Sequence, residues 1–499
     1  MFERVYDVGI IGGGLTGTSI ARDAAGRGLS VMLCEEGDLG GRASSASDRL
    51  VRGGLDHLGR LEVPALRLGL VERGILRNAA PHLVRPLRFV LPHHDQLWPR
   101  WALGLGFFAY DRLGRRTLPP GKRLDFDGAD LDTALHAHFH AGFAYSDCIA
   151  DDARLVIAHA MDARQRGASI NPRLRCVVAE RERERWRLSL ETPSGEWVVA
   201  HVRILINAAG GEAASVLDHV VHTNNSTPVT LTRHSQIVVR RPDNGDAAYA
   251  LPTGDGRIIH SVPHAPGFML LGSAEARHRR GATEAFVGPA DVAYLTDVAN
   301  QYFDRPVLAD DIAQRLACVT AMPEDESLAS GDHAVIIETD PGGAPLVSVF
   351  GGELTTHRHM AEEVVDRLAR FRKVGEPWTA GARLPGGNFT PDSGIREFCH
   401  ALCAAYPFVG EDHAHRLVTT YGTRAPAILV GARSAADLGI WFGADLTEAE
   451  VEFLRREEWA MDAEDVLWRR TRLGLSFTAG EADALSAWMA ETTREPVLA

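Results

Sequence analysis

The stretch Gly12-Gly13-Gly14-Leu15-Thr16-Gly17 decides the fold of this chain. An apolar run over residues 6–11 precedes it, a predicted helix over residues 16–26 follows it, and residues 29–34 form a second apolar run. Strand, tight turn, helix and strand in this order make a βαβ unit. The sequence therefore predicts an α/β fold built on a Rossmann-type dinucleotide-binding core.

Each glycine of the motif has its own task in such a turn. Gly12 permits the tight turn, Gly14 lets the backbone approach a pyrophosphate, and Gly17 lets the helix pack closely against the strand. The helix N-terminus then offers free N–H groups and a partial positive charge to the phosphates. Glu35 ends the second strand, 23 residues after Gly12, where a carboxylate binds the ribose hydroxyls. Together these residues favour a bound dinucleotide over a glycine turn without one.

Three later segments distinguish FAD from NAD. Ser44-Ser45-Ala46-Ser47 supplies hydroxyls just after the second strand, and residues 204–210 form an apolar strand that ends in small residues beside the expected adenosine. Residues 350–356 form a strand-to-helix turn, and a helix that starts there can aim its positive end at the flavin pyrimidine. We therefore predict FAD, bound by Gly12, Gly14, Leu15, Thr16, Gly17, Glu35, Glu36, Ser44, Ser45, Ser47, Ala209, Gly210, Gly352, Leu354 and Thr355.

Composition and charge exclude several other classes of protein. The formal net charge of −13 disfavours binding to nucleic acid. The six cysteines lack metal-site spacing and are expected to be reduced thiols. His136, His138 and His140 would share one face of a strand, but no carboxylate or cysteine completes a site, so we predict no metal. No signal-peptide pattern opens the chain, and no apolar run reaches the roughly 18 residues of a membrane span.

The order of strand and helix patterns predicts three units. A β-rich insertion interrupts the dinucleotide fold, and its runs over residues 228–275 predict an antiparallel sheet. Leu384-Pro385-Gly386-Gly387 marks a linker, after which a capping box of Thr447 and Glu450 opens one helix and residues 462–472 form another. We expect an FAD-binding domain from residues 1–75, 146–215 and 335–383, a substrate domain from residues 76–145 and 216–334, and a helical C-terminal domain over residues 388–499.

Further motifs run through nearly the whole chain. They are residues 23–31, 44–54, 143–148, 151–155, 348–352, 384–387, 406–408 and 465–471. With these motifs the chain resembles the aerobic, FAD-dependent glycerol-3-phosphate dehydrogenases. The resemblance implies a FAD domain, a substrate domain with an antiparallel sheet and a helical C-terminal domain. It also implies hydride transfer from a substrate carbon to flavin N5, with electrons passed on to quinone.

The departures from that family fall in the predicted substrate pocket and remove positive charge. Where the family pattern has an Arg in the early loop, this chain has Asp56, and where it has a Lys after the late glycine pair, this chain has Glu353. Two further family Arg positions correspond to Thr320 and, across a small deletion, to Gly331. Such cations would bind a substrate phosphate, so the resemblance implies that glycerol 3-phosphate is a poor substrate here.

The same alignment supplies the catalytic candidates. Gln236 aligns with a family His over the flavin, Arg52 replaces another His, and Glu275 replaces an Asp. The candidate set is Arg52, Asp56, His57, Gln236, Glu275 and Glu353. We expect oxidation of a small hydroxyl- or amine-bearing substrate by hydride transfer to flavin N5. Two alternatives stay open: an ordinary glycerol-3-phosphate dehydrogenase whose phosphate site is rebuilt from arginines such as Arg52 or Arg233, and an FAD-binding interaction protein without catalysis.

An aromatic segment suggests a partner surface. Residues 97–108 are apolar and aromatic, and they are followed by Arg112, Arg115, Arg116, Lys122 and Arg123. Such a segment can lie on a membrane surface, and burial within the substrate domain is the alternative. The resemblance supports the membrane reading, because the family is peripheral at the inner membrane. We expect a cytoplasmic protein, with a peripheral place on the inner face of the membrane, quinone or oxygen as electron acceptor, and a homodimer as open alternatives.

Overall fold

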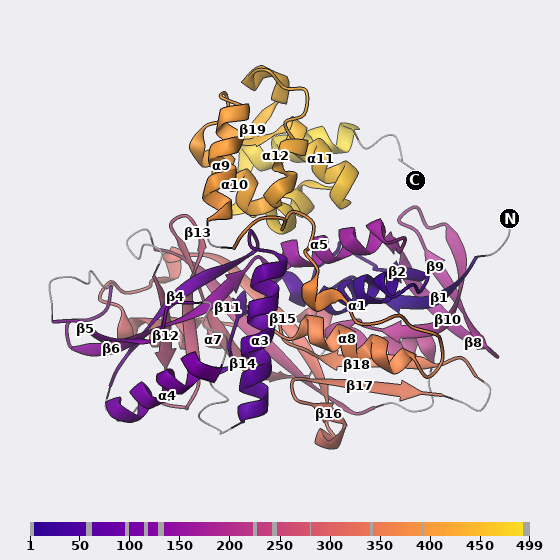
Figure 1. Ribbon diagram of the computed structural model, residues 1–499, viewed down its shortest axis with the longest axis horizontal. Helices are drawn as coiled ribbons and strands as arrows, with labels where there is room; N and C mark the ends of the chain where they lie inside the picture. Colours follow the sequence, from indigo (N-terminus) through magenta and orange to yellow (C-terminus); the bar gives the residue numbers. More distant parts are fainter. Residues whose placement is uncertain are drawn as a thin grey trace.

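Figure 1 shows three units in the computed structural model of the chain. The structure describes residues 4–55, 62–94, 99–113, 118–127, 134–222, 227–241, 247–279, 281–339, 343–391 and 393–492. Two nine-stranded sheets lie side by side, and the chain passes between them several times. The helical unit near the C-terminus, drawn from orange to yellow, sits above both sheets in this view.

The first sheet contains the predicted dinucleotide-binding core. Its strand order is β16-β17-β18-β10-β1-β2-β7, and β8 and β9 extend it from β10. The central strands β18, β10, β1, β2 and β7 pair in parallel, as a Rossmann-type core requires. The strands are β1 (Val5–Ile11), β2 (Val31–Cys34), β7 (Ser169–Asn171), β8 (Arg175–Glu182), β9 (Arg185–Glu191), β10 (Trp197–Asn207), β16 (Ala329–Ser330), β17 (His333–Glu338) and β18 (Leu346–Gly351).

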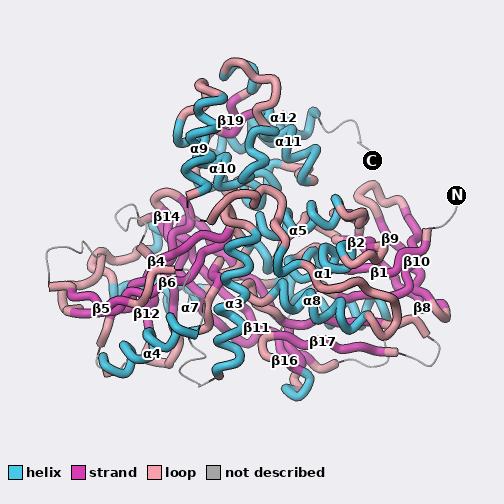
Figure 2. The backbone as a smooth tube through the Cα atoms, viewed as in Figure 1, coloured by secondary structure: helices cyan, strands magenta, loops and turns pink. Residues whose placement is uncertain are grey.

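Three helices accompany this sheet: α1 (Leu15–Gly26), α5 (Asp152–Gln165) and α8 (His357–Leu368). Figure 2 shows them together, and α1 contacts both of the others. Ile20, Ala21 and Ala24 of α1 are fully buried. Two of these three side chains are single methyl groups, so the neighbouring helices can approach α1 closely.

The second sheet confirms the antiparallel insertion expected over residues 228–275. Its order is β15-β11-β14-β13-β12-β4-β6-β3, with β5 beside β6, and among its described strands only the β12–β4 pair is parallel. The strands are β3 (Leu50–Val51), β4 (Val84–Pro92), β5 (Lys122–Asp125), β6 (Ala141–Ala150), β11 (Val229–Arg240), β12 (Ala248–Pro252), β13 (Ile258–Ala265), β14 (Phe268–His278) and β15 (Ile312–Pro323). The accompanying helices are α3 (Val63–Ala79), α4 (Arg100–Leu113) and α7 (Pro289–Tyr302).

The prediction of a strand around His136, His138 and His140 is wrong. Leu135 forms a single bridge to Phe303, and a turn follows it. The rings of His136 and His138 stack with centroids 5.4 Å apart, and His140 bonds to Asp127 instead. The three rings therefore do not converge, and the described residues contain no metal-binding cluster.

The helical unit has a hydrophobic core of its own, which includes Leu417, Val418, Val451, Leu454 and Val466. Its elements are α9 (Gly394–Ala405), α10 (Glu411–Tyr421), α11 (Glu448–Glu458), α12 (Ala479–Thr492) and a hairpin of β19 (Trp441–Gly443) and β20 (Leu446–Thr447).

The helix starts and ends of this unit bear out one expectation and correct another. At the predicted capping box, the Thr447 hydroxyl accepts from the N–H of Glu450, with 3.4 Å between the two atoms, and α11 follows. The helix expected over residues 462–472 is different. It is a π-helical turn, η10 (Asp465–Arg470), that ends before Arg472.

Candidate active site

The glycine turn after β1 leaves no room for side chains. Gly12 has a φ of +115°, and a Cβ there would lie 2.4 Å from the carbonyl oxygen of Ala208. A Cβ on Gly17 would lie 2.0 Å from the carbonyl oxygen of Gly12. Backbone atoms cannot yield as a flexible side chain can, so these two positions require glycine.

The N-terminus of α1 suits a pyrophosphate. Its N-cap, Gly14, supplies no side-chain cap, and the first turn contains no acidic residue. The N–H of Leu15 donates to the Ser44 hydroxyl over 2.9 Å, whereas the first amides of a helix have no partner within the helix. Amide donors, the helix dipole and a nearby hydroxyl thus meet where an anion would be held.

Glu35 follows β2 and contacts the glycine turn at residues 12–17, which we call the nucleotide turn. Its carboxylate accepts from the N–H of Gly13 at 2.6 Å and from the N–H of Gly37 at 2.8 Å. Burial raises the pKa of Glu35. Each carboxylate oxygen has a second lone pair, so the group can still accept bonds from ribose hydroxyls.

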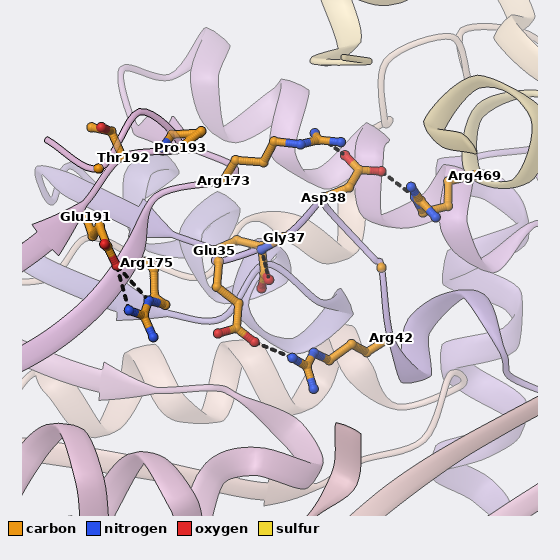
Figure 3. Close-up of a pocket in the computed structure, with 13 residues that line it drawn as sticks. Glu35, Gly37, Asp38, Arg42, Arg173, Arg175, Glu191, Thr192, Pro193 and Arg469 are labelled. Atoms are coloured by element: carbon orange, nitrogen blue, oxygen red, sulfur yellow. Dashed lines mark hydrogen bonds and ion pairs between the residues drawn. The ribbon is translucent and has the colours of Figure 1, made fainter. Parts of the chain in front are cut away.

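A cavity of about 580 Å³ opens beside Glu35 (Figure 3). Arginines and acidic residues pair along its walls: Arg42 pairs with Glu36, and Arg175 pairs with Glu191 at 2.6 Å. The predicted contributor Glu36 is thus one of the residues that line the cavity. The lining residues are Glu35, Glu36, Gly37, Asp38, Gly41, Arg42, Arg173, Arg175, Glu191, Thr192, Pro193, Gly195 and Arg469. The cavity lies at the end of β2, where the adenosine half is expected.

The other small residues predicted for the cofactor have local roles as well. The Ser47 hydroxyl donates to Asp152 at 2.6 Å, and the Ser45 hydroxyl donates to the carbonyl of Arg42 at 3.1 Å. The N–H of Ala209 donates to the side chain of Asn207, and Gly210 has a φ of +58°. Of the three serines, Ser44 is the one whose hydroxyl contacts the nucleotide turn directly.

The flavin turn, residues 351–356, is held by a residue that the sequence did not single out. Gly351 and Gly352 have φ values of +71° and +94°. The carbonyl of Asp332 accepts from the N–H of Gly352, and its carboxylate accepts from the N–H of Glu353, both at 2.9 Å. The Thr356 hydroxyl donates to the same carboxylate. Asp332 thus shapes the turn before α8 begins at His357.

His333 contacts Asp332 and Glu363 at the same time. Its Nδ1 lies 2.9 Å from the Asp332 carboxylate and its Nε2 lies 3.0 Å from the Glu363 carboxylate. Although burial alone would lower it, the two acidic partners raise the pKa of His333 above its ordinary value. Protonated His333 can donate to both carboxylates at once, whereas a neutral ring can donate to one.

We predict that this contact makes stability depend on pH. A histidine whose folded pKa is raised stabilises the fold fully below its unfolded pKa of about 6.5, and that contribution is lost as pH rises through the folded pKa. The free energy of unfolding of wild type should therefore exceed that of His333→Gln most at about pH 6, by about 1–3 kcal/mol at most, and less above neutrality. Thermal melts from acid to alkaline pH measure it, and a pH-independent difference would contradict it.

A buried pair of histidines lies behind the flavin turn. Nδ1 of His357 donates to the carbonyl of Leu354 over 2.7 Å, so its Nε2 must accept from Nε2 of His159, 3.0 Å away. Burial lowers the pKa of His357 to about 4 and lowers that of His159 as well. Both rings are therefore neutral, and they fix the Leu354 carbonyl. No sequence pattern connects positions 159 and 357.

Unpaired polar atoms gather on three neighbouring strands. Gln236 donates from Nε2 to the carbonyl of Ala46 at 3.2 Å, but its Oε1 is buried without a partner. Ser273 Oγ and His260 Nδ1 are also buried and unpartnered. Gln236 lies on β11, Ser273 on β14 and His260 on β13, and these strands are adjacent. Buried groups without partners suit a bound ligand that would supply them.

A second polar cluster lies at β11, β14 and β15. Nε2 of His234 lies 2.9 Å from the Thr320 hydroxyl, and Nδ1 lies 3.5 Å from a Glu275 oxygen. The hydrogen bond from His234 is the main cause that lowers the pKa of Glu275. The sequence pointed to Glu275, Thr320 and, among the histidines that could compensate, His234, and the structure places His234 between the other two.

Of the remaining catalytic candidates, Arg52 and Glu353 lie at the flavin turn. The N–H of Arg52 donates to the Thr355 hydroxyl at 2.9 Å, and its guanidinium pairs with Asp48, so this loop meets the flavin turn. Glu353 stands in that turn and is exposed. Asp56 and His57 lie outside the described residues.

Comparisons with known proteins agree with this geometry. Residues 7–358 match the family described as FAD dependent oxidoreductase, and residues 378–495 match the C-terminal domain of alpha-glycerophosphate oxidase. The chain is 39% identical to a glycerol-3-phosphate dehydrogenase of Pseudomonas aeruginosa, over 97% of this chain and 95% of that protein. It is 36% identical to the aerobic glycerol-3-phosphate dehydrogenase of Escherichia coli, over 98% of each.

Two further relatives extend the comparison. The chain is 37% identical to a D-erythritol 1-phosphate dehydrogenase of Brucella abortus, over 97% of each. Its fold matches the crystal structure of a glycerol-3-phosphate dehydrogenase from Bacillus halodurans complexed with FAD, with a TM-score of 0.77, 23% identity, and coverage of 99% of this chain and 91% of that chain. The cofactor is FAD. The chain therefore belongs to the aerobic, FAD-dependent glycerol-3-phosphate dehydrogenase family.

Proposed function

We propose that this enzyme oxidises a small hydroxyl- or amine-bearing substrate without a phosphate group, by hydride transfer from a substrate carbon to FAD. One observation carries the proposal. Thr320, at a position where the family resemblance implies an arginine, shares its hydroxyl with His234, which in turn pairs with Glu275. A neutral hydroxyl, an imidazole and a carboxylate suit a polar or cationic group better than a dianion.

The charges nearby support the same substrate class. The lowered pKa of Glu275 keeps it anionic at neutral pH, and Glu353 adds a second carboxyl group at the flavin turn. Arg52 already forms an ion pair with Asp48. Two unit charges 4 Å apart interact by about 4 kcal/mol at an effective dielectric constant of 20. A phosphate dianion would therefore be repelled, and an ammonium group would be attracted.

The residues of the chain divide the remaining work. Bound FAD supplies the hydride-accepting chemistry. The amide oxygen of Gln236, fixed through its bond to Ala46, can accept a hydrogen bond from the substrate hydroxyl or amine. The Glu275 carboxylate can hold the proton that leaves the substrate, because it is ionised and exposed. His234 orients that carboxylate.

A second candidate substrate is a polyol phosphate, bound at a rebuilt site. The relatives named above include two glycerol-3-phosphate dehydrogenases and a D-erythritol 1-phosphate dehydrogenase, and Arg52 stands beside the flavin turn. Arg233 is a poor contributor to such a site, because both oxygens of Asp291 accept from it at 2.8 Å.

Anaerobic flavin reduction separates these candidates. The purified enzyme is mixed with glycerol 3-phosphate, D-erythritol 1-phosphate, the two dephosphorylated polyols and a 1,2-amino alcohol, and flavin absorbance is followed. We expect faster, saturable bleaching by a compound without phosphate. Faster bleaching by either phosphate ester would favour the rebuilt site. Bleaching by none of them would favour an FAD-binding protein without this catalysis.

We further propose that α4 rests on a membrane surface, from which a quinone could be reached. Its Trp101, Leu105 and Phe108 are 74%, 61% and 51% exposed at spacings of four and three residues, so they share one face. Arg112 lies over the Phe108 ring at 4.1 Å. An exposed aromatic face flanked by cations is typical of interfacial helices. No helix among the described residues is long and apolar enough to cross a bilayer.

We predict that Trp101→Ser with Phe108→Ser weakens binding to anionic lipid vesicles by about tenfold or more, since large apolar side chains contribute about 1.5–3 kcal/mol each when buried. Vesicle co-sedimentation measures it. The matched control is Trp197→Ser, which removes an aromatic side chain that is 60% exposed on β10. Equal binding by the double variant and wild type would contradict an interfacial α4.

A further inference from the structure

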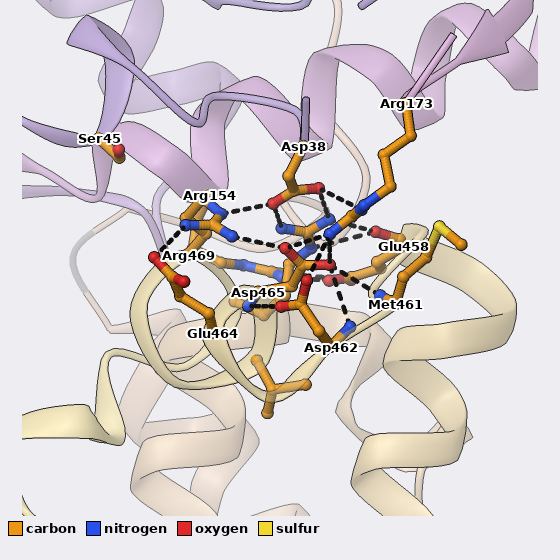
Figure 4. A network of polar contacts seen from close by, with 12 residues as sticks. Asp38, Ser45, Arg154, Arg173, Glu458, Met461, Asp462, Glu464, Asp465 and Arg469 are labelled. Atoms are coloured by element: carbon orange, nitrogen blue, oxygen red, sulfur yellow. Dashed lines mark hydrogen bonds and ion pairs between the residues drawn. The ribbon is translucent and has the colours of Figure 1, made fainter. Parts of the chain in front are cut away.

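Apart from the bond of Asp152 to Ser47, two sequence motifs have no task in the site described so far: residues 151–155, and residues 465–471 of the helical unit. In space they belong together. Figure 4 shows charged side chains from the helical unit meeting Asp38, Arg154 and Arg173 of the FAD-binding unit in one network. Three arginines at and just after the end of the π-helical turn, Arg469, Arg470 and Arg472, supply the contacts to Asp38, Asp151 and Asp152. We call these three residues the arginine latch.

The first arm of the latch reaches the loop that follows Glu35. Both oxygens of Asp38 accept from Arg470, at 2.6 and 2.7 Å, and Arg469 donates to Asp38 at 2.5 Å. The side chains of Asp38 and Arg470 are 3% and 0% exposed. Buried, bidentate contacts of this kind are the strong class of ion pair. They fix Asp38 to the helical unit.

Asp38 is continuous with the nucleotide turn. The N–H of Gly37 binds the Glu35 carboxylate at 2.8 Å, and the N–H of Gly40 donates to the carbonyl of Gly13 at 3.0 Å. Asp38 lies between these two bonds. A shift of Asp38 would therefore move both the residue expected at the ribose and the turn expected at the pyrophosphate.

The second arm, Arg472, is connected through Asp151 and Asp152 to the serine segment at residues 44–47. Arg472 donates from Nε to both oxygens of Asp151 at 3.1 Å, and its Nη2 pairs with Asp152. The other oxygen of Asp152 accepts the Ser47 hydroxyl at 2.6 Å. Ser44, three residues earlier, accepts the N–H of Leu15 at the start of α1. Arg472 adopts a φ of +58°, which is uncommon for a residue with a side chain.

We propose that the arginine latch makes the helical C-terminal unit a clamp on the FAD site. Its two arms hold the two ends of segment 37–47, which crosses the cofactor's adenosine and pyrophosphate positions. Arg470 and Arg472 are positioning residues that act through Asp38, Asp151 and Asp152, whereas Arg469 also lines the cavity beside Glu35. The clamp slows FAD release whatever the substrate is, so it does not depend on the proposed substrate class.

Full-length holoenzyme variants test the clamp. Asp38→Asn keeps the shape of the side chain but removes its charge, and Arg472→Met keeps the apolar stem but removes the second arm. Each is expected to release FAD about tenfold faster or more than wild type, because charge-assisted bonds are lost. Release is followed by FAD fluorescence after dilution, well below the melting temperature of each variant. Arg472→Lys, which keeps the charge, should fall between wild type and Arg472→Met.

Arg416→Gln is the matched control. Arg416 pairs with Glu450 at 2.7 Å and with Asp445, wholly inside the helical unit. It should lower the melting temperature of the helical unit and leave FAD release unchanged. If Asp38→Asn and Arg472→Met release FAD at the wild-type rate, or no faster than Arg416→Gln, the network only attaches two domains and the proposal is wrong. If Asp38→Asn does not fold, Arg472→Met decides alone.

Discussion

Gly17→Ala is expected to abolish FAD binding. The new Cβ would lie 2.0 Å from the carbonyl oxygen of Gly12, well inside van der Waals contact. Either α1 moves away from β1 or the nucleotide turn opens, and both displace the amides that face the pyrophosphate. Overpacking a closely packed site typically costs about 1–3 kcal/mol, and a clash with backbone lies at the upper end because backbone yields least. We expect at least a hundredfold loss of affinity, since about 1.4 kcal/mol is a factor of ten. Titration of the apoprotein with FAD measures it.

Gly74→Ala is the control for that experiment. It makes the same chemical change inside α3, where a Cβ would meet nothing within 4 Å. Alanine there should bind FAD like wild type and raise helix stability by roughly 0.5–1 kcal/mol. Gly17→Ala with normal FAD affinity would mean that the turn adapts, and the role assigned to Gly17 would be wrong. Melting of the two apoproteins distinguishes lost binding from lost folding.

Asp56→Arg with Glu353→Lys is expected to raise affinity for glycerol 3-phosphate by about a hundredfold or more. Two carboxylates become cations at positions where the family resemblance implies cations for the substrate phosphate. Each charge-assisted contact contributes about 1.5–3 kcal/mol. The concentration dependence of anaerobic flavin reduction measures the change. Affinity for an amino alcohol should fall in the same variant.

A control of equal net charge is available for the charge swap. Asp310→Arg with Glu376→Lys changes two exposed acidic residues outside the candidate set. It reproduces any general attraction of an anion to a less acidic protein, so it should alter affinity little. If the two double variants gain equally, Asp56 and Glu353 do not face the substrate, and the alignment on which the proposed substrate class rests is incorrect.

Local patterns in the sequence predicted the parts of the fold that depend on neighbours along the chain. The βαβ unit around Gly12, the antiparallel runs over residues 228–275 and the start of α11 at Thr447 each depend on residues within a few positions. The same kind of pattern failed at residues 135–140, where polar–apolar alternation suggested a strand. There the backbone turns after its single bridge to Phe303.

The features that were missed join distant positions. Asp332 anchors the flavin turn across 24 residues to Thr356, and His159 meets His357 across 198 residues. The latch joins Asp38 to Arg470 across 432 residues. Such contacts leave no periodicity or spacing in a single sequence, so only the fold reveals them. The motif at residues 465–471 was visible, but its contact with Asp38 was not.

The buried contacts of the arginine latch also bear on how the protein unfolds. If docking of the helical unit tightens FAD binding, then FAD must tighten docking by the same factor, since coupling between two equilibria is reciprocal. Heated with its cofactor, the protein should melt as one cooperative block. Without FAD, the helical unit and the FAD-binding unit should unfold in two separate calorimetric transitions, because each has a hydrophobic core of its own. A cell short of flavin would then hold a partly undocked enzyme, with its interdomain charges exposed to solvent and to proteases.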